Sequence, residues 1–295
     1  MAREGLDASV TARTALDLGL DAIVVAAPLR KFEWEPLKAL LPGHAAASIE
    51  LFLPFPSSLP SGAPCPFHAA SLDAGERKQA LQQGLETVIE AERKEIPVIH
   101  LTPIALEVSL REAWLSLQPD QPFVDHRRAQ ILQRRANEAC RRIDSLKSFL
   151  GGLLESADRY GRQIAMVPGG FPDEVPSLKE MQDLLREFRG APLTVWADTL
   201  RAAASWPGNP LADWPLKASC SHLTVRDFGA RFTSIPLGEG RLNRDWAMPL
   251  LEISSLWVLD AEASTSPELL EAGLAGLRAL AESPKPEKTA NWLGI

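Results

Sequence analysis

Residues 163–197 read QIAMVPGGFPDEVPSLKEMQDLLREFRGAPLTVWA, and this stretch decides the fold. It opens with a short apolar run at residues 163–167 and closes on another at residues 193–197. Between them, residues 177–188 place apolar side chains three or four positions apart. A short continuous apolar run is typical of a strand that is buried on both faces, whereas the wider spacing indicates an amphipathic helix. The stretch therefore predicts two parallel strands joined by a right-handed helical crossover.

The same alternation continues in both directions along the chain. Further apolar runs lie at residues 22–27, 48–52, 96–101, 222–226 and 256–259, and further helical patterns at residues 8–18, 74–93, 127–160 and 267–281. Seven such strands with intervening helices predict an α/β, TIM-type (β/α)8 barrel formed by residues 1–282, followed by a C-terminal tail at 283–295. Strand one is expected to be short or missing, because few residues precede the first helix and these include Glu4 and Asp7.

Composition limits the classes of function. The 295 residues include 45% hydrophobic and 23% charged residues, which is ordinary for a globular protein, and the net charge of −7 argues against general nucleic-acid binding. No apolar run reaches membrane-spanning length, and the N-terminus does not read as a signal peptide. Three cysteines without a disulfide or metal-ligand pattern suit a reducing compartment, so we expect a soluble cytoplasmic protein. Monomer and homodimer both stay open, although Trp292 in the tail and the gap at strand one favour an interface.

Barrel enzymes build their sites from the residues at the carboxyl ends of the strands. Four carboxylates are expected there, and they would repel one another unless a cation offsets them. A divalent metal is one such cation, and the neighbouring arginines Arg201, Arg226 and Arg231 are another. Alternatively, each acid caps a helix or forms a loop salt bridge. The candidate carboxylates are Asp198, Asp227, Asp260 and Glu262, and the candidate histidines are His68, His100 and His222.

A glycine-containing loop precedes one of the expected helices. Residues 234–243 read SIPLGEGRLN, which is only weakly similar to a phosphate-binding loop because the Walker spacing is missing. A plain turn before a helix is the alternative interpretation.

Three segments, taken together and in this order, resemble the sugar phosphate isomerase/epimerase superfamily, the xylose-isomerase-like barrels that also include endonuclease-IV-type enzymes. They are FHAASLDAGERKQALQQGLETVIEAERKEIPVIHLTP at residues 67–103, WADTLRAA at 196–203 and LTVRDFGARFTSIPLGEGRLN at 223–243. The resemblance extends from about residue 15 to 282. It implies an enzyme that moves a proton on a carbon next to a carbonyl or hydroxyl group, with one divalent metal held by Glu, Asp, His and Glu.

Carried onto this sequence, the four implied metal ligands fall on Val167, Asp198, Thr224 and Asp260. A valine offers no donor atom, and a threonine hydroxyl is a poor ligand compared with imidazole. Asp198 and Asp260 with water would therefore hold Mg²⁺ or Mn²⁺ weakly or not at all. The histidine that often follows the family aspartate is Arg201 here.

The remaining candidates follow from position. His100, His222, Asp227 and Glu262 are the candidate acid/base residues, and a hydrogen-bonded core position is the alternative for each histidine. The candidate substrate-binding residues are Arg201, Arg226 and His68.

Three functions remain open on the sequence. The first is an isomerase or epimerase of a small sugar or sugar phosphate. The second is a non-catalytic ligand-binding or partner protein that kept the barrel and lost the metal site. The third, hydrolysis of damaged DNA, is the least supported, because it needs several metals and a basic groove.

Overall fold

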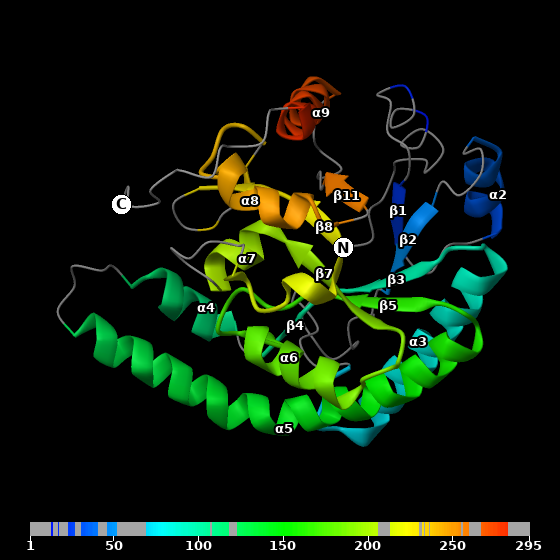
Figure 1. Cartoon of the computed structure of the whole chain (residues 1–295). Helices are drawn as coiled ribbons and strands as arrows, with labels where there is room; N and C mark the ends of the chain where they lie inside the picture. Colours follow the sequence, from blue (N-terminus) through cyan, green and yellow to red (C-terminus); the bar gives the residue numbers. More distant parts are fainter. Residues whose placement is uncertain are drawn as a thin grey trace.

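The computed structural model describes residues 13, 17, 23–26, 31–40, 46–51, 69–106, 108–117, 123–205, 213–229, 232, 234–235, 237–254, 256–259 and 267–282. Its main sheet contains seven strands in the order β1-β2-β3-β5-β7-β8-β11, and every neighbouring pair is parallel. The strands are β1 (Ile23–Ala26), β2 (Ala46–Glu50), β3 (Val98–Leu101), β5 (Gln163–Met166), β7 (Leu193–Asp198), β8 (Cys220–Val225) and β11 (Leu256–Leu259). All seven predicted strands are confirmed, and their spatial order follows the chain as in a TIM-type barrel (Figure 1). Among the described strands, no pairing joins β1 to β11.

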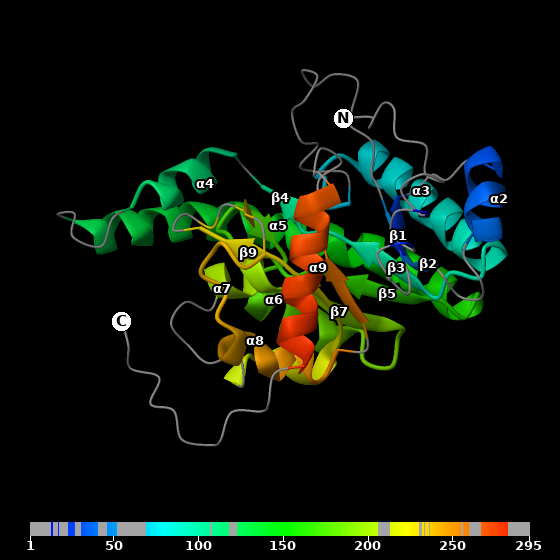
Figure 2. The ribbon, with the colours of Figure 1, turned by 90° about the horizontal axis from the view of Figure 1, so that it is seen from above.

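Helices cover the outside of this sheet (Figures 1 and 2). They are α2 (Lys31–Leu40), α3 (Ala74–Arg93), α4 (Val108–Leu115), α5 (Val124–Arg159), α6 (Leu178–Glu187), α7 (Thr199–Ser205), α8 (Arg244–Leu251) and α9 (Pro267–Glu282). The sequence pattern placed α3, α5, α6 and α9 within a few residues of their observed bounds. It did not indicate α2, α4 and α7, since each is shorter than three full turns.

Local sequence explains where two of the predicted helices begin. Asp73 caps α3, because its side chain accepts a hydrogen bond from the Glu76 amide at 2.9 Å. At α6, Ser177 and Glu180 form a capping box in which each side chain accepts from the other residue's backbone amide. Both caps satisfy amides that would otherwise lack partners at the start of a helix.

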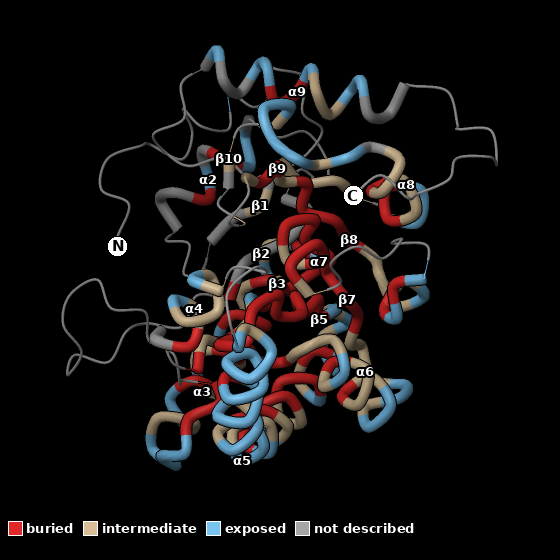
Figure 3. Tube along the Cα trace, turned by 90° about the vertical axis from the view of Figure 1, so that its left-hand side faces the viewer, coloured by how far each residue is buried: buried red, intermediate tan, exposed pale blue. Residues whose placement is uncertain are grey.

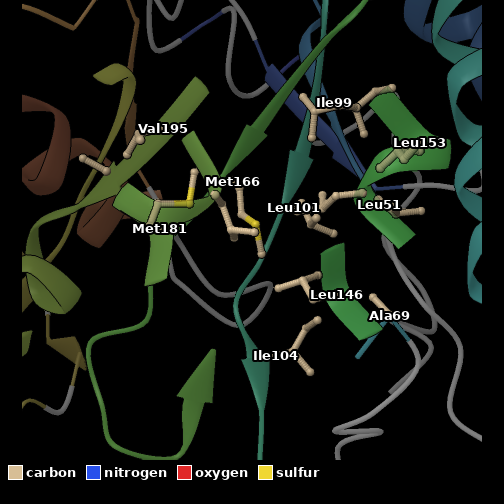
Figure 4. Packing of buried hydrophobic residues seen from close by; sticks show 14 of the residues in the cluster. Leu51, Ala69, Ile99, Leu101, Ile104, Leu146, Leu153, Met166, Met181 and Val195 are labelled. Carbon is tan, nitrogen blue, oxygen red and sulfur yellow. The ribbon is translucent and has the colours of Figure 1, made fainter. Parts of the chain in front are cut away.

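The main hydrophobic core lies between the sheet and the helices. Ile99, Met166 and Val195 point outward from β3, β5 and β7 and belong to one buried cluster with Leu153 of α5 and Met181 of α6 (Figure 4). Figure 3 shows the same division, with buried segments along the strands and exposed segments along the outer side of α5. Alternation along the strands sends the other residues to the opposite face.

That opposite face forms a second, separate cluster. Val98, Ala165, Val167 and Trp196 are buried together there, with Val24 and Val258 packed against them. These residues come from β1, β3, β5, β7 and β11 and the position just after β5, so the cluster fills the inside of the barrel. Trp196 is its largest member and is completely buried.

Two short antiparallel strand pairs lie beyond the carboxyl ends of the main-sheet strands. β4 (Ile104–Ala105) pairs with β6 (Glu174–Val175), and β9 (Asp227–Phe228) pairs with β10 (Ser234–Ile235). The chain after β3 forms β4 and α4. α5 begins at Val124, three residues before its predicted start at residue 127.

Several expectations fall on residues outside the described ranges. These are the short or missing strand one, the tail at 283–295 and most of the helix at 8–18, of which Arg13 and Asp17 are helical. No helix in the described ranges combines the length and the apolar character that crossing a membrane requires.

Candidate functional site

The site lies at the carboxyl ends of β5, β7 and β8, where barrel enzymes place their chemistry. Asp198 is the last residue of β7 and is paired in register with Thr224 of β8. Arg226 follows β8 directly, and Arg201 lies in the first turn of α7. The predicted grouping of Asp198, Arg201 and Arg226 is therefore present.

These residues belong to a continuous chain of six alternating charges, here called the ion-pair row. Its members, in spatial order, are Asp173, Arg111, Glu174, Arg201, Asp198 and Arg226. The five links between them measure 3.0, 2.7, 3.2, 3.3 and 3.2 Å between nitrogen and oxygen. The row joins α4, the segment after β5, the start of α7 and the end of β8.

The acids and the arginines of the row lie in different layers. Each of the three carboxylates is only 3% exposed, whereas the side chains of Arg111, Arg201 and Arg226 are 36%, 22% and 29% exposed. The arginine side chains are thus partly exposed and lie against buried carboxylates, although the Nε atoms of Arg201 and Arg226 are buried. Because three positive and three negative charges alternate, the row is formally neutral.

Burial and neighbouring charge shift two groups in the row. Burial raises the pKa of Asp173, and the nearby Arg111 only partly opposes this effect. Burial alone would lower the pKa of Arg201, but Glu174 and Asp198 outweigh it and raise the pKa. Arg201 is therefore a permanent cation at the centre of the row.

A glycine turn allows Glu174 to reach its position. Glu174 Oε2 accepts hydrogen bonds from the amides of Gly170 at 2.7 Å and Phe171 at 3.3 Å. A Cβ atom on Gly170 would lie 2.7 Å from the Cα of Arg201, and one on Gly169 would lie 2.6 Å from the Cβ of Glu174. Gly170 is therefore needed for the close approach of this turn to α7, and Gly169 for its close approach to Glu174.

Below the row, three aromatic rings stack inside the barrel. Trp196 lies between His100 and His222, with ring centroids 4.2 Å and 4.8 Å apart and interplanar angles of 23° and 13°. The indole nitrogen of Trp196 donates a hydrogen bond of 2.7 Å to the hydroxyl of Thr224. The stack fills the space beneath the rim and ties together β3, β7 and β8.

Both histidines are held in the neutral form. Burial lowers the pKa of His222, whose Nδ1 lies 2.7 Å from the Ser221 hydroxyl. Burial, followed by the charges of Arg201, Arg226 and His222, lowers the pKa of His100 to about 3. Neither ring nitrogen of His100 has a hydrogen-bond partner among the described residues.

The carboxylate of Asp227 accepts hydrogen bonds from four backbone amides of the same chain. Its Oδ1 accepts from the amides of Phe228 and Leu242, at 2.8 and 2.7 Å, and its Oδ2 accepts from Gly238 and Gly240, both at 2.9 Å. The segment 234–243 is therefore wrapped around a carboxylate of the same chain. A catalytic role for Asp227 stays a prediction, one that these four contacts do not favour.

The described residues do not fit a divalent metal. The Oδ2 atom of Asp198 faces both Arg201 and Arg226, so two cations already offset its charge. Its Oδ1 accepts a hydrogen bond from the Arg201 amide at 3.0 Å. Asp198 therefore caps the N-terminus of α7, as the alternative interpretation of this carboxylate predicts. Within the described ranges, no three His, Cys, Asp or Glu side chains come together as a metal-binding group.

The structure places some predicted site residues together and leaves others undescribed. Asp198, Arg201 and Arg226 meet at the carboxyl ends of the strands, and His100 and His222 stack on Trp196 beneath them, inside the barrel. His68, Asp260, Glu262 and Arg231 lie outside the described residues, so their roles stay predictions.

Sequence reasoning missed half of the ion-pair row. Asp173 and Glu174 follow β5 in the segment PGGFPDE, and a wider search beyond the strand end would have found this acidic pair. Arg111 lies on α4, which the sequence did not indicate, and no signal pointed to it. Trp196 was treated as an ordinary strand residue.

No family model and no curated protein matches this sequence. Solved structures do match over nearly the full length of both chains. A D-tagatose 3-epimerase-like protein is 14% identical with a TM-score of 0.65, covering 92% of this chain and 91% of its own. A 3-keto-D-glucoside 4-epimerase from E. coli is 13% identical with a TM-score of 0.65, covering 95% and 97%. A probable 3-DHS dehydratase from Bacillus anthracis is 12% identical with a TM-score of 0.61, covering 96% of each. The chain therefore has the xylose-isomerase-like TIM-barrel fold of these sugar epimerases and dehydratase.

Proposed function

We propose that the barrel binds a sugar or sugar phosphate at the carboxyl ends of its strands, and that it does so without a divalent metal. The ion-pair row carries this proposal. Three partly exposed arginine side chains, each held in place by a buried carboxylate, would offer N–H donors that suit hydroxyl and phosphate oxygens. The sugar epimerases of the same fold support carbohydrate as the ligand class.

The contacts of the carboxylates favour binding over metal-assisted proton transfer. Asp198 and Glu174 accept from arginines and backbone amides, and Asp227 accepts from four amides. An acid/base residue must be free to exchange a proton with the substrate. None of these three carboxylates is free in that sense.

Calorimetric titration tests the proposal directly. D-tagatose, L-ribulose and a ketohexose 6-phosphate would be titrated into the protein in EDTA and again with added Mn²⁺. We expect at least one sugar to bind with equal affinity under both conditions. Arg226→Gln should weaken binding of the phosphorylated sugar by about tenfold, since a charged hydrogen bond contributes on the order of 1.5 kcal/mol or more. Lys78→Gln, on the outer surface of α3, should leave binding unchanged.

Two results would contradict the proposal: binding that requires Mn²⁺, or no binding of any sugar in the panel. The first would restore the metal-dependent mechanism, with Asp260 or another undescribed residue completing the site.

Isomerase or epimerase activity is a second candidate, favoured by the position of His100. Its imidazole is neutral at physiological pH and lies close enough to Arg201 and Arg226 for their charges to lower its pKa. The low pKa makes His100 a weak base, so stabilisation of the oxyanion by a nearby guanidinium would have to supply most of the driving force for proton abstraction.

Hydrogen exchange tests this activity. Incubation of a bound ketose in D₂O should place deuterium on the carbon next to the carbonyl, as measured by NMR. His100→Phe should abolish the exchange, whereas His126→Phe, which changes an exposed histidine of α5, should not. Absence of exchange with a sugar that binds would leave the protein as a binding protein.

A further inference from the structure

The ring of His100 lies inside the barrel with both of its nitrogens buried and unpaired. On β3, Val98 and His100 face the interior, whereas Ile99 packs in the outer core. Neither Nδ1 nor Nε2 of His100 has a hydrogen-bond partner among the described residues, although the residue as a whole keeps intermediate exposure. Buried polar atoms are nearly always paired, so an unpaired imidazole that a small ligand can still reach points to a binding role.

The imidazole of His100 is held in place by its face alone. It stacks on the indole of Trp196 at 4.2 Å between ring centroids and at an angle of 23°. His222 stacks on the other side of the same indole, but its Nδ1 already lies 2.7 Å from the Ser221 hydroxyl. Stacking therefore fixes the orientation of His100 while leaving both nitrogens available for a ligand.

His100 lies beneath the ion-pair row. Asp198 follows Trp196 by two residues on β7, so it faces the same side of the sheet about 7 Å further along the strand. Arg201 and Arg226 both pair with Asp198. The imidazole is therefore within electrostatic reach of these two guanidinium groups, whose charges both lower its pKa.

Arg201 supplies another buried donor at this place. Its Nη1 and Nη2 atoms bond to Asp198 at 3.3 Å and to Glu174 at 3.2 Å. Its Nε atom is buried and has no hydrogen-bond partner within the described ranges. Because a guanidinium N–H can only donate, the partner that suits it is an oxygen atom.

The chemistry of these atoms favours a hydroxyl group over an anion. One nitrogen of a neutral imidazole donates a hydrogen bond and the other accepts one. A hydroxyl group can pair with either nitrogen, since it both donates and accepts. A carboxylate or a phosphate dianion only accepts, so it can never pair with the unprotonated nitrogen of His100.

We propose that His100 determines specificity by binding a hydroxyl group of the sugar inside the barrel, with the Nε of Arg201 donating to a neighbouring oxygen of the same molecule. The inference rests on the proposed function, which supplies the sugar. A phosphate group, where the sugar carries one, stays with the arginines at the rim, and the end with unsubstituted hydroxyl groups passes beneath the row.

Affinity measurements on His100→Phe test the proposal. Phenylalanine keeps a ring that can stack on Trp196 and removes both nitrogens. Calorimetric titration with D-tagatose, L-ribulose and a ketohexose 6-phosphate should show about tenfold weaker binding than in the wild type, the effect of one to two lost hydrogen bonds. Urea unfolding at neutral pH should show no loss of stability, which separates a role in binding from a role in packing.

Trp214→Phe is the matched control. The indole nitrogen of Trp214 is also buried without a hydrogen-bond partner among the described residues, but this side chain belongs to the outer core and precedes β8. Its replacement should leave sugar affinity unchanged. Equal affinity of the wild type and His100→Phe would overturn the inference and leave the proposed function in place. Failure of all three sugars to bind the wild type would overturn the proposed function and this inference with it.

Nitrogen NMR of protein with ¹⁵N-labelled histidine gives a second readout. The His100 signals are assigned by their loss in His100→Phe. Saturation with the sugar that binds should change the ¹⁵N shift of at least one ring nitrogen of His100 and leave those of His126, an exposed residue of α5, in place. Unchanged His100 shifts at saturation would also overturn the inference.

Deoxy sugars identify the hydroxyl group. In a series of monodeoxy derivatives of the sugar that binds, one member should bind the wild type about tenfold more weakly than the parent and lose nothing further in His100→Phe. This coupling is expected because the variant and the derivative remove the two ends of the same hydrogen bond. Additive losses for every member of the series would contradict a direct contact between His100 and a hydroxyl group.

Discussion

The indole of Trp196 donates a hydrogen bond to the hydroxyl of Thr224 at 2.7 Å, and Thr224 is the residue that the family resemblance aligns with a metal-binding histidine. Thr224 faces the barrel interior, where it holds Trp196, the largest of the fully buried side chains among the described residues. The residue that the resemblance would make a metal ligand is here part of the packing.

Thr224→Val should destabilise the protein by roughly 1–3 kcal/mol, because the buried indole N–H loses its acceptor while the side-chain volume stays nearly the same. Urea unfolding followed by circular dichroism measures the change. Thr224→Ser keeps the hydroxyl and should cost less than Thr224→Val. Equal losses for the two variants would show that the methyl group, not the hydrogen bond, matters at this position.

The central link of the ion-pair row should contribute measurably to stability. A double-mutant cycle with Glu174→Gln and Arg201→Met should give a coupling energy of about 1–3 kcal/mol, since Glu174 is buried and the two groups are in direct contact. The exposed pair Arg159–Glu155 on α5 is a matched control, and its coupling should stay below about 0.5 kcal/mol. A coupling near zero for Glu174 and Arg201 would mean that the row does not act as a connected unit.

Acid should destabilise the protein through His100. Its folded pKa of about 3 lies well below its unfolded value of about 6.5, so the unfolded chain binds an extra proton between these two pH values. The contribution of His100 to the free energy of unfolding is therefore fully present above about pH 6.5 and is lost as the pH drops. At pH 5 this one group lowers the free energy of unfolding by about 2 kcal/mol. Urea unfolding at several pH values measures the slope.

His100→Phe should reduce that slope and should not destabilise the protein at pH 5, because it also removes two buried nitrogens that have no hydrogen-bond partner among the described residues. The burial of His222 predicts a smaller contribution with the same sign. An unchanged slope in the His100→Phe variant would assign the acid sensitivity to other groups.

The PGG turn should not tolerate a side chain at Gly170. Gly170→Ala would place a Cβ atom 2.7 Å from the Cα of Arg201, and we expect a loss of about 2 kcal/mol or more in thermal or urea unfolding. Gly151 of α5 is a matched control, because a Cβ there meets nothing within 4 Å. Gly151→Ala should stabilise the protein by about 0.5–1 kcal/mol through helix propensity. A neutral Gly170→Ala would show that the turn can move away from α7.

Short buried strands were predictable from the sequence because a parallel sheet covered on both faces leaves continuous apolar runs such as residues 163–167. The long helices followed from their periodicity. The short helix α4 was not predictable, since eight residues give too few repeats for a pattern, and Arg111 was missed with it. At the site, residues directly at strand ends were found, including Asp198 and Arg226. Glu174 was missed because its position depends on how a glycine turn folds back, which spacing alone does not encode.

Asp227 explains why the segment 234–243 looks similar to a phosphate-binding loop. Its carboxylate occupies the centre of a ring of backbone amides from Phe228, Gly238, Gly240 and Leu242. A Cβ atom on Gly240 would overlap that carboxylate. The loop thus binds an anion that belongs to the same chain, the carboxylate of Asp227, where a phosphate-binding loop would bind an anion from solution. Gly238 and Gly240 let the backbone approach this carboxylate closely, and the amides that a phosphate would need already donate hydrogen bonds to Asp227.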